Sequence, residues 1–163
     1  MNPKNHNHQI IHRSAKNFQF AIVVSRFNKH ITEKLLEGAE RCLCKHKVPK
    51  KNWKVVFCPG AFELPQVANK LAQQKRWDAI ICLGAIIRGE TPHFKYICTE
   101  TARGIQNTAL YHSLPVVFGV LTTNDEQQAF ERVGGAQGDK GWEAVLTAIE
   151  MATLFKSLNR SSR

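Results

Sequence analysis

The sequence predicts an α/β protein: a three-layer αβα sandwich around a four-stranded parallel sheet. Four apolar runs alternate with segments of helical period, the order expected of right-handed crossovers between parallel strands. Residues 80–87 are apolar without alternation, as in a strand covered on both faces. Each run is followed by a polar stretch, and parallel sheets bind their ligands at those strand ends.

The elements follow in order along the chain. We expect strands at residues 18–24, 53–58, 77–87 and 115–123, and helices at 31–45, 64–74, 91–111, 125–132 and 142–158. Apolar residues in the first helix recur with the helical period. Gly104 lies inside the third helix at a cost of roughly 1 kcal/mol relative to alanine, which close packing would explain.

The chain of 163 residues has the length of one domain. We expect an N-terminal arm at residues 1–17, the domain at 18–158 and a tail at 159–163. No apolar run reaches the ~18 residues of a membrane span, and the N-terminus does not resemble a signal peptide, so we expect a cytoplasmic protein. His6, His8 and His12 lack a second cluster with which to form a stable metal site.

The formal net charge of +10 is compatible with nucleic acid, with an anionic substrate or with a solvated face. Many of the charges surround one loop that contains Lys45, Lys47, Lys50, Lys51 and Lys54. We therefore expect a solvated face and no nucleic-acid partner. The five cysteines are an odd set without a secretory signal, so we expect reduced, structural thiols.

The stretch after residue 87 has the pattern of a polar loop that leads into a helix. Thr91 and Pro92 fit an N-cap and the first helical position. The free backbone N–H groups of such a first turn suit an anion. His93 follows, and an imidazole can take and give a proton near neutral pH, although a capping or core role is equally open.

The other strand ends supply further candidates. Phe27 and Phe62 offer flat faces for a ring or belong to the core, and Glu63 accepts hydrogen bonds from a ligand or is solvated. Candidates for a phosphate, or for plain surface charge, are Arg88, Arg132 and Lys140. The glycine-rich loop before Lys140 lacks the spacing of a P-loop. With no dinucleotide fingerprint or metal-ligand spacing either, we expect no cofactor and no metal.

Several of these motifs, taken together, resemble the lumazine synthases of riboflavin biosynthesis. The resemblance runs in order from about residue 18 to 158 and rests on residues 25–28 (SRFN), 59–65 (PGAFELP), 84–94 (GAIIRGETPHF), 124–128 and 138–141 (GDKG). It implies a flavodoxin-like fold and a transferase without a cofactor. The implied reaction condenses 5-amino-6-(D-ribitylamino)uracil with 3,4-dihydroxy-2-butanone 4-phosphate and yields 6,7-dimethyl-8-ribityllumazine, phosphate and water.

The resemblance also implies a role for each matching residue. His93 would transfer protons, and Glu90 and Thr91 would hold the phosphate with help from Arg132. The uracil substrate would contact one large set of side chains: Phe27, Ala61, Phe62, Glu63, Ala85, Ile86, Ile87, Phe118 and Lys140. Of these, Phe118 and Lys140 would come from a neighbouring subunit, because family members place the site between adjacent subunits of a pentamer.

Two other functions fit parts of the pattern. A flavodoxin-like binding module for a flavin or nucleotide would use the aromatic and phosphate sites but leaves His93 without a task. A basic shell-forming or nucleic-acid-binding protein without catalysis would use the charge. The resemblance leaves pentamers, decamers and shells of sixty subunits open; residues 134–141 resemble the short loop of shell-forming members, which favours the shell.

Overall fold

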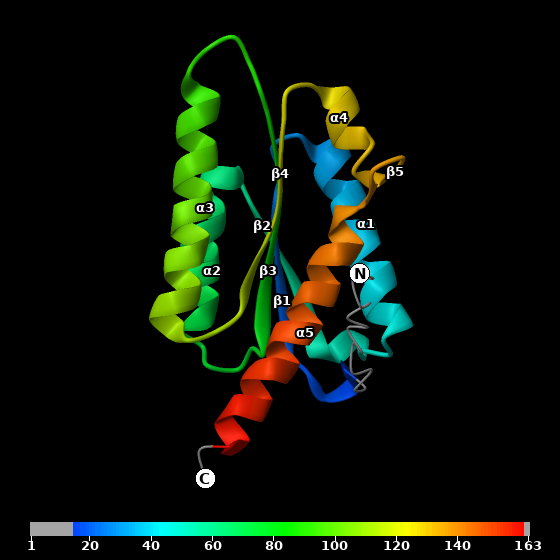
Figure 1. Ribbon diagram of the computed structural model, residues 1–163, viewed down its shortest axis with the longest axis vertical. Helices are drawn as coiled ribbons and strands as arrows, with labels where there is room; N and C mark the ends of the chain where they lie inside the picture. Colours follow the sequence, from blue (N-terminus) through cyan, green and yellow to red (C-terminus); the bar gives the residue numbers. More distant parts are fainter. Residues whose placement is uncertain (1–14, 162–163) are drawn as a thin grey trace, which may run out of the picture.

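The computed structural model describes residues 15–161 and has one four-stranded parallel sheet at its centre (Figure 1). The strands lie in the order β2-β1-β3-β4. Their bounds are β1 Phe20–Ser25, β2 Trp53–Cys58, β3 Ala79–Ile87 and β4 Val116–Thr123. All pairings are parallel, with Val23 opposite both Val56 and Cys82. The carboxyl ends of the four strands therefore meet at one edge of the sheet.

Helices cover both faces of the sheet and make the three predicted layers. On one face lie α1 Lys29–Lys45 and α5 Lys140–Ser161, and on the other lie α2 Leu64–Ala72 and α3 His93–His112. Successive residues of β1 pack alternately into two hydrophobic cores. Ile22 packs into the core that α1 and α5 cover, and Val23 packs into the core that α2 and α3 cover. A strand buried on both faces needs apolar residues throughout, which accounts for the continuous run in β3.

The predicted order of these helices and strands is confirmed, and most bounds differ by one to three residues. One local prediction was wrong. Thr91 does not cap α3: the helix begins at His93 after Pro92, and no side chain caps its first turn. The preceding loop is held by Arg88 instead, as described below.

Short elements that the sequence did not predict follow β4 and precede β1. After α4 Glu126–Phe130, the strands β5 Val133–Gly135 and β6 Gly138–Asp139 form an antiparallel pair. Of the expected N-terminal arm, residues 1–14, with all three of its histidines, lie outside the described residues, whereas Ala15–Asn17 form a 3-10 helix with Ala15 buried. Among residues 15–161 no helix is long and apolar enough to cross a membrane.

Close packing at Gly104 explains why α3 carries a glycine in its interior. A Cβ atom built on Gly104 would lie 2.8 Å from Cβ and Cγ of Pro65, in the first turn of α2. The small residue thus lets α3 approach the start of α2, directly after the loop that carries Glu63.

Gly104→Ala is expected to destabilise the protein by about 1–3 kcal/mol, although alanine is the better helix former. The added methyl group must push Pro65 away. Thermal unfolding at fixed protein concentration measures the loss. The exposed Ala102→Gly in the same helix is the matched control, since it loses only the helix propensity of about 1 kcal/mol. A Gly104→Ala protein more stable than the wild type would contradict this account.

Candidate functional site

Backbone hydrogen bonds tie the loops at the carboxyl edge of the sheet to one another. The Phe27 N–H donates to the Pro59 carbonyl over 3.0 Å, extending the pairing of β1 with β2. The Arg88 N–H donates to the Thr123 carbonyl over 2.9 Å, extending the pairing of β3 with β4. The loops therefore leave the sheet as two linked pairs.

A hollow of about 730 Å³, here called the histidine pocket, opens beside these ends. Its volume suits a small molecule. It is lined by residues of three loops and of the start of α3: Phe27, Gly60, Ala61, Phe62, Glu63, Ala85, Ile86, Ile87, Gly89, Thr91, His93, Phe94 and Ile97. Phe27 is 70% exposed and Phe62 46%, so neither belongs to the core. Both rings are free to stack on a planar ligand.

The loop that carries Ala61 and Glu63 is held from two sides. The buried Thr101 on α3 donates its hydroxyl to the Ala61 carbonyl over 3.3 Å. The Cys58 thiol donates to the Gly60 carbonyl over 3.4 Å. Burial and the neighbouring Glu63 charge raise the pKa of Cys58 to about 11, so this thiol keeps its proton at neutral pH and remains a donor.

Asn28 fixes the turn that presents Phe27. It adopts a left-handed conformation with φ of 55°, which asparagine tolerates better than most residues. Its side-chain amide donates to the Ala85 carbonyl over 2.9 Å, joining the end of β1 to β3. Asn28 is therefore a positioning residue of the pocket.

Arg88 braces the loop before His93. Its Nε donates to Oδ1 of Asn124 over 2.9 Å, at the end of β4. Its guanidinium carbon lies 4.6 Å from the ring centre of Phe94, close enough for a cation–π contact. The side chain thus joins the loop of residues 88–92 both to the next strand end and to α3.

A second hollow of about 720 Å³, here called the arginine groove, runs along the outer edge of β4 between α3 and α5. Predicted site residues that line it are Phe118, Arg132 and Lys140. Phe118 is 42% exposed, and much of the remaining wall is aliphatic. The groove and the histidine pocket share no residue.

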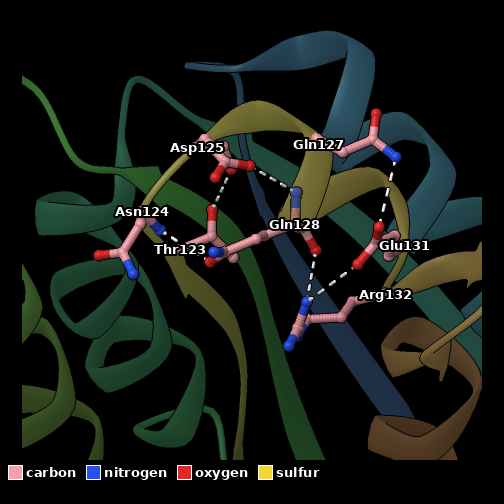
Figure 2. Close-up of polar contacts among 7 residues, drawn as sticks. All are labelled: Thr123, Asn124, Asp125, Gln127, Gln128, Glu131 and Arg132. Atoms are coloured by element: carbon pink, nitrogen blue, oxygen red, sulfur yellow. Dashed lines mark hydrogen bonds and ion pairs between the residues drawn. The ribbon is translucent and has the colours of Figure 1, made fainter.

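The turn at α4 places Arg132, as Figure 2 shows. The Asp125 carboxylate caps α4 by accepting the Gln128 N–H over 2.8 Å, and the Gln128 side chain accepts the Asn124 N–H over 3.1 Å. Nη1 of Arg132 then donates to the Gln128 carbonyl over 2.8 Å. The same Nη1 lies 4.0 Å from Oε2 of Glu131, so one end of the guanidinium is anchored by a carbonyl and a carboxylate.

Lys140 stands at the start of α5 and is joined to Arg132 through the backbone. The Lys140 N–H donates to the Arg132 carbonyl over 2.8 Å. Its ammonium group pairs with the Glu143 carboxylate at 2.5 Å. Glu143 also lines the groove, so this wall carries two cations and one carboxylate.

The thirteen predicted site residues fall into two separate groups. Nine line the histidine pocket, three line the arginine groove, and the exposed Glu90 lines neither. The predicted set lacks four residues of the histidine pocket, Gly60, Gly89, Phe94 and Ile97, and the charged Glu143 of the arginine groove. Ile97 follows His93 by one helical turn and Glu143 follows Lys140 by three residues, so helical spacing was the signal that pointed to them.

Neither a cluster of metal-ligating side chains nor a disulfide bond occurs among residues 15–161. Within residues 15–161, no group of three or more His, Cys, Asp or Glu side chains is arranged to hold a metal ion. All five cysteines are free thiols. Burial, together with the nearby Asp139 charge, raises the pKa of Cys42 to about 12, and burial also raises the pKa of Cys82. The exposed lysines at the end of α1 and the start of β2 line neither hollow.

A sequence model of the 6,7-dimethyl-8-ribityllumazine synthase family matches residues 17–156. The chain belongs to this family. The match spans all four strands of the parallel sheet and both hollows. A lumazine synthase is a transferase of riboflavin biosynthesis that acts on small-molecule substrates and works as an oligomer. The resemblance drawn from the sequence motifs is thus confirmed at the level of the family.

Proposed function

We propose that the chain condenses 5-amino-6-(D-ribitylamino)uracil with 3,4-dihydroxy-2-butanone 4-phosphate to 6,7-dimethyl-8-ribityllumazine, phosphate and water. The observation that carries this proposal is the meeting of two exposed phenylalanine rings, Glu63 and His93 in one pocket of about 730 Å³. The rings suit the flat uracil, and the carboxylate suits the ribityl hydroxyls. A cytoplasmic location, expected from the sequence, belongs to the same proposal.

His93 is the proposed proton-transfer residue. The uracil amine attacks the ketone, a Schiff base forms with loss of one water molecule, phosphate leaves by elimination, and the ring closes with loss of a second water molecule. Each step moves a proton, and a histidine in the pocket can carry it. Holding both substrates together supplies a larger share of the rate enhancement than proton transfer does, since orientation alone lowers the activation free energy by roughly 7–11 kcal/mol in ideal cases.

The proposed phosphate site is the start of α3 together with Arg132. No side chain caps the first turn of α3. The Lys95 N–H is bonded to the Pro92 carbonyl over 3.0 Å, so an anion beside Thr91 would meet the N–H groups of His93 and Phe94. A Glu90 carboxylate would repel a phosphate, and Glu90 therefore contributes through its backbone N–H. Arg132 supplies the positive charge.

We further propose that each site lies between two copies of the chain in a pentamer. His93 and Arg132 line different hollows of one chain, although both are assigned to the same reaction. If one copy packs its histidine pocket against the arginine groove of the next, the two sets of residues meet. Such head-to-tail packing forms a closed pentamer when the rotation between successive copies closes after five of them.

The test of the proposed activity is an assay with both purified substrates, in which the fluorescent lumazine product is measured with time. Formation of product at a rate that saturates in each substrate is the expected result. Tight binding of a flavin or nucleotide without product formation would instead identify a flavodoxin-like binding module.

Arg132→Ala is expected to raise KM for the butanone phosphate by about 10- to 100-fold, the value of one or two charge-assisted hydrogen bonds. Inhibition by inorganic phosphate should weaken in parallel. The control is Arg103→Ala, which removes an exposed arginine of α3 that lines neither hollow. An unchanged KM in the Arg132 variant would assign the phosphate to Arg88 or to the backbone of α3.

A further inference from the structure

Arg132 and Lys140 belong to one small structural unit. Between them, β5 and β6 pair antiparallel with Val133 opposite Asp139, and the Lys140 N–H closes the unit on the Arg132 carbonyl. A displacement of this hairpin would move both cations of the arginine groove together.

Asp139 attaches the hairpin to α1. Its Oδ1 accepts the N–H of Trp142 over 3.0 Å, in the first turn of α5. Its Oδ2 accepts from Nη2 of Arg41 over 2.6 Å. The Asp139 side chain is only 19% exposed, and such partial burial strengthens an ion pair relative to one in open solvent. One carboxylate therefore caps α5 and binds α1 at once.

The surface of α1 is shaped to receive this carboxylate. A Cβ atom built on Gly38 would collide with the carboxylate of Asp139. Gly38 lies three residues before Arg41, so the two share one face of the helix. The glycine supplies the space and the arginine supplies the charge.

We propose that the Arg41–Asp139 pair is a positioning device that sets Arg132 and Lys140 for substrate binding, an inference that rests on the proposed function. Arg41 lines neither hollow and so touches no substrate. It acts through Asp139 and the hairpin. Since a shift of about 1 Å in a binding group can cost up to 100-fold in rate, a remote pair that fixes the hairpin has a measurable effect.

The experiment compares Arg41→Ala with Glu40→Gln. The control substitutes the neighbouring residue of α1, whose carboxylate forms a 3.5 Å ion pair with Lys50 rather than with Asp139. Arg41→Ala is expected to raise KM for both substrates by about 3- to 10-fold while kcat stays within about twofold. Arg41→Lys should restore part of the loss, and Glu40→Gln should match the wild type.

Amide hydrogen exchange tests the role of the Arg41–Asp139 pair without a measurement of enzyme activity. The amides of Lys140 and Trp142 should exchange faster in Arg41→Ala than in the control, because their partners become mobile. Asp139→Asn keeps an oxygen for the Trp142 N–H and removes the charge, so it separates capping from ion pairing. It should resemble Arg41→Ala in KM and show slower exchange at Trp142 than Asp139→Ala.

Two outcomes would overturn the inference: unchanged KM values with unchanged exchange in Arg41→Ala, or a loss confined to kcat and melting temperature, as a merely structural role would give. If the wild type makes no lumazine, the proposed function fails by itself. Hydrogen exchange and the binding of inorganic phosphate then test the positioning role of the Arg41–Asp139 pair on their own. Faster exchange with weaker phosphate binding in Arg41→Ala supports the positioning role, and equal values contradict it.

Discussion

His93→Ala is expected to lower kcat by about 100-fold while leaving a measurable enzyme, because general acid–base catalysis typically contributes 10²–10⁴-fold and the pocket still orients both substrates. KM values should change little, since Phe27, Glu63 and the start of α3 remain in place. Steady-state measurement of lumazine formation over the full range of both substrates separates kcat from KM.

His93→Gln is the matched variant for this experiment. It keeps a polar side chain of similar reach but cannot relay protons near neutral pH. It should therefore be as slow as the alanine variant. His112→Ala serves as the control, because His112 lies at the other end of α3, where it pairs with Asn69 at 2.7 Å. Full kcat in either His93 variant would remove this residue from the mechanism.

The sheet was predictable because the burial of a strand restricts the residue types that its sequence can contain. A strand covered on both faces must be apolar throughout, and β3 shows this run without interruption. Its order among helical segments then predicts parallel pairing and the position of the site at the carboxyl ends. Phe27, Glu63 and His93 could be assigned to one site on this argument alone.

Details that depend on tertiary contacts were not predictable. Thr91 has the sequence context of an N-cap, but the loop before α3 is held by the contacts of Arg88 with Asn124 and Phe94. Arg88 itself was equally compatible with phosphate binding or a solvated surface. The β5–β6 hairpin is a short glycine-rich segment without a period-2 pattern, so nothing in its sequence indicated a strand pair.

The separation of the site into two hollows also depends on tertiary structure. Phe118 and Lys140 are assigned to the same reaction as His93, but they line the groove along the outer edge of β4 and not the histidine pocket. No periodicity in the sequence says which side of a strand end a loop will occupy. The resemblance to the lumazine synthases implied that the site is shared between copies, and this stays a prediction.

Mixed oligomers of His93→Ala and Arg132→Ala chains are expected to show, at a low concentration of the butanone phosphate, more activity than the mean of the two variants. If each site takes its histidine pocket from one copy and its arginine groove from the next, random mixing in equal amounts leaves about one site in four with both halves intact, as follows from head-to-tail packing. Co-expression of the two chains with different tags, followed by two-step purification, yields the mixed oligomers. The lumazine assay, run with the butanone phosphate below the wild-type KM, then gives the rate per site, which both substitutions lower.

A second mixture makes the result decisive. Chains that carry both substitutions, mixed equally with the wild type, leave about one site in four intact if sites are shared and about one in two if each chain holds its own site. In the mixture of the two single variants the order is reversed. About one site in four is intact if sites are shared, and none is intact if each chain holds its own site. Activity equal to the mean of the two parents in the first mixture, together with half of the wild-type value in the second, would place His93 and Arg132 of the same chain in one site. The arginine groove would then need a role of its own.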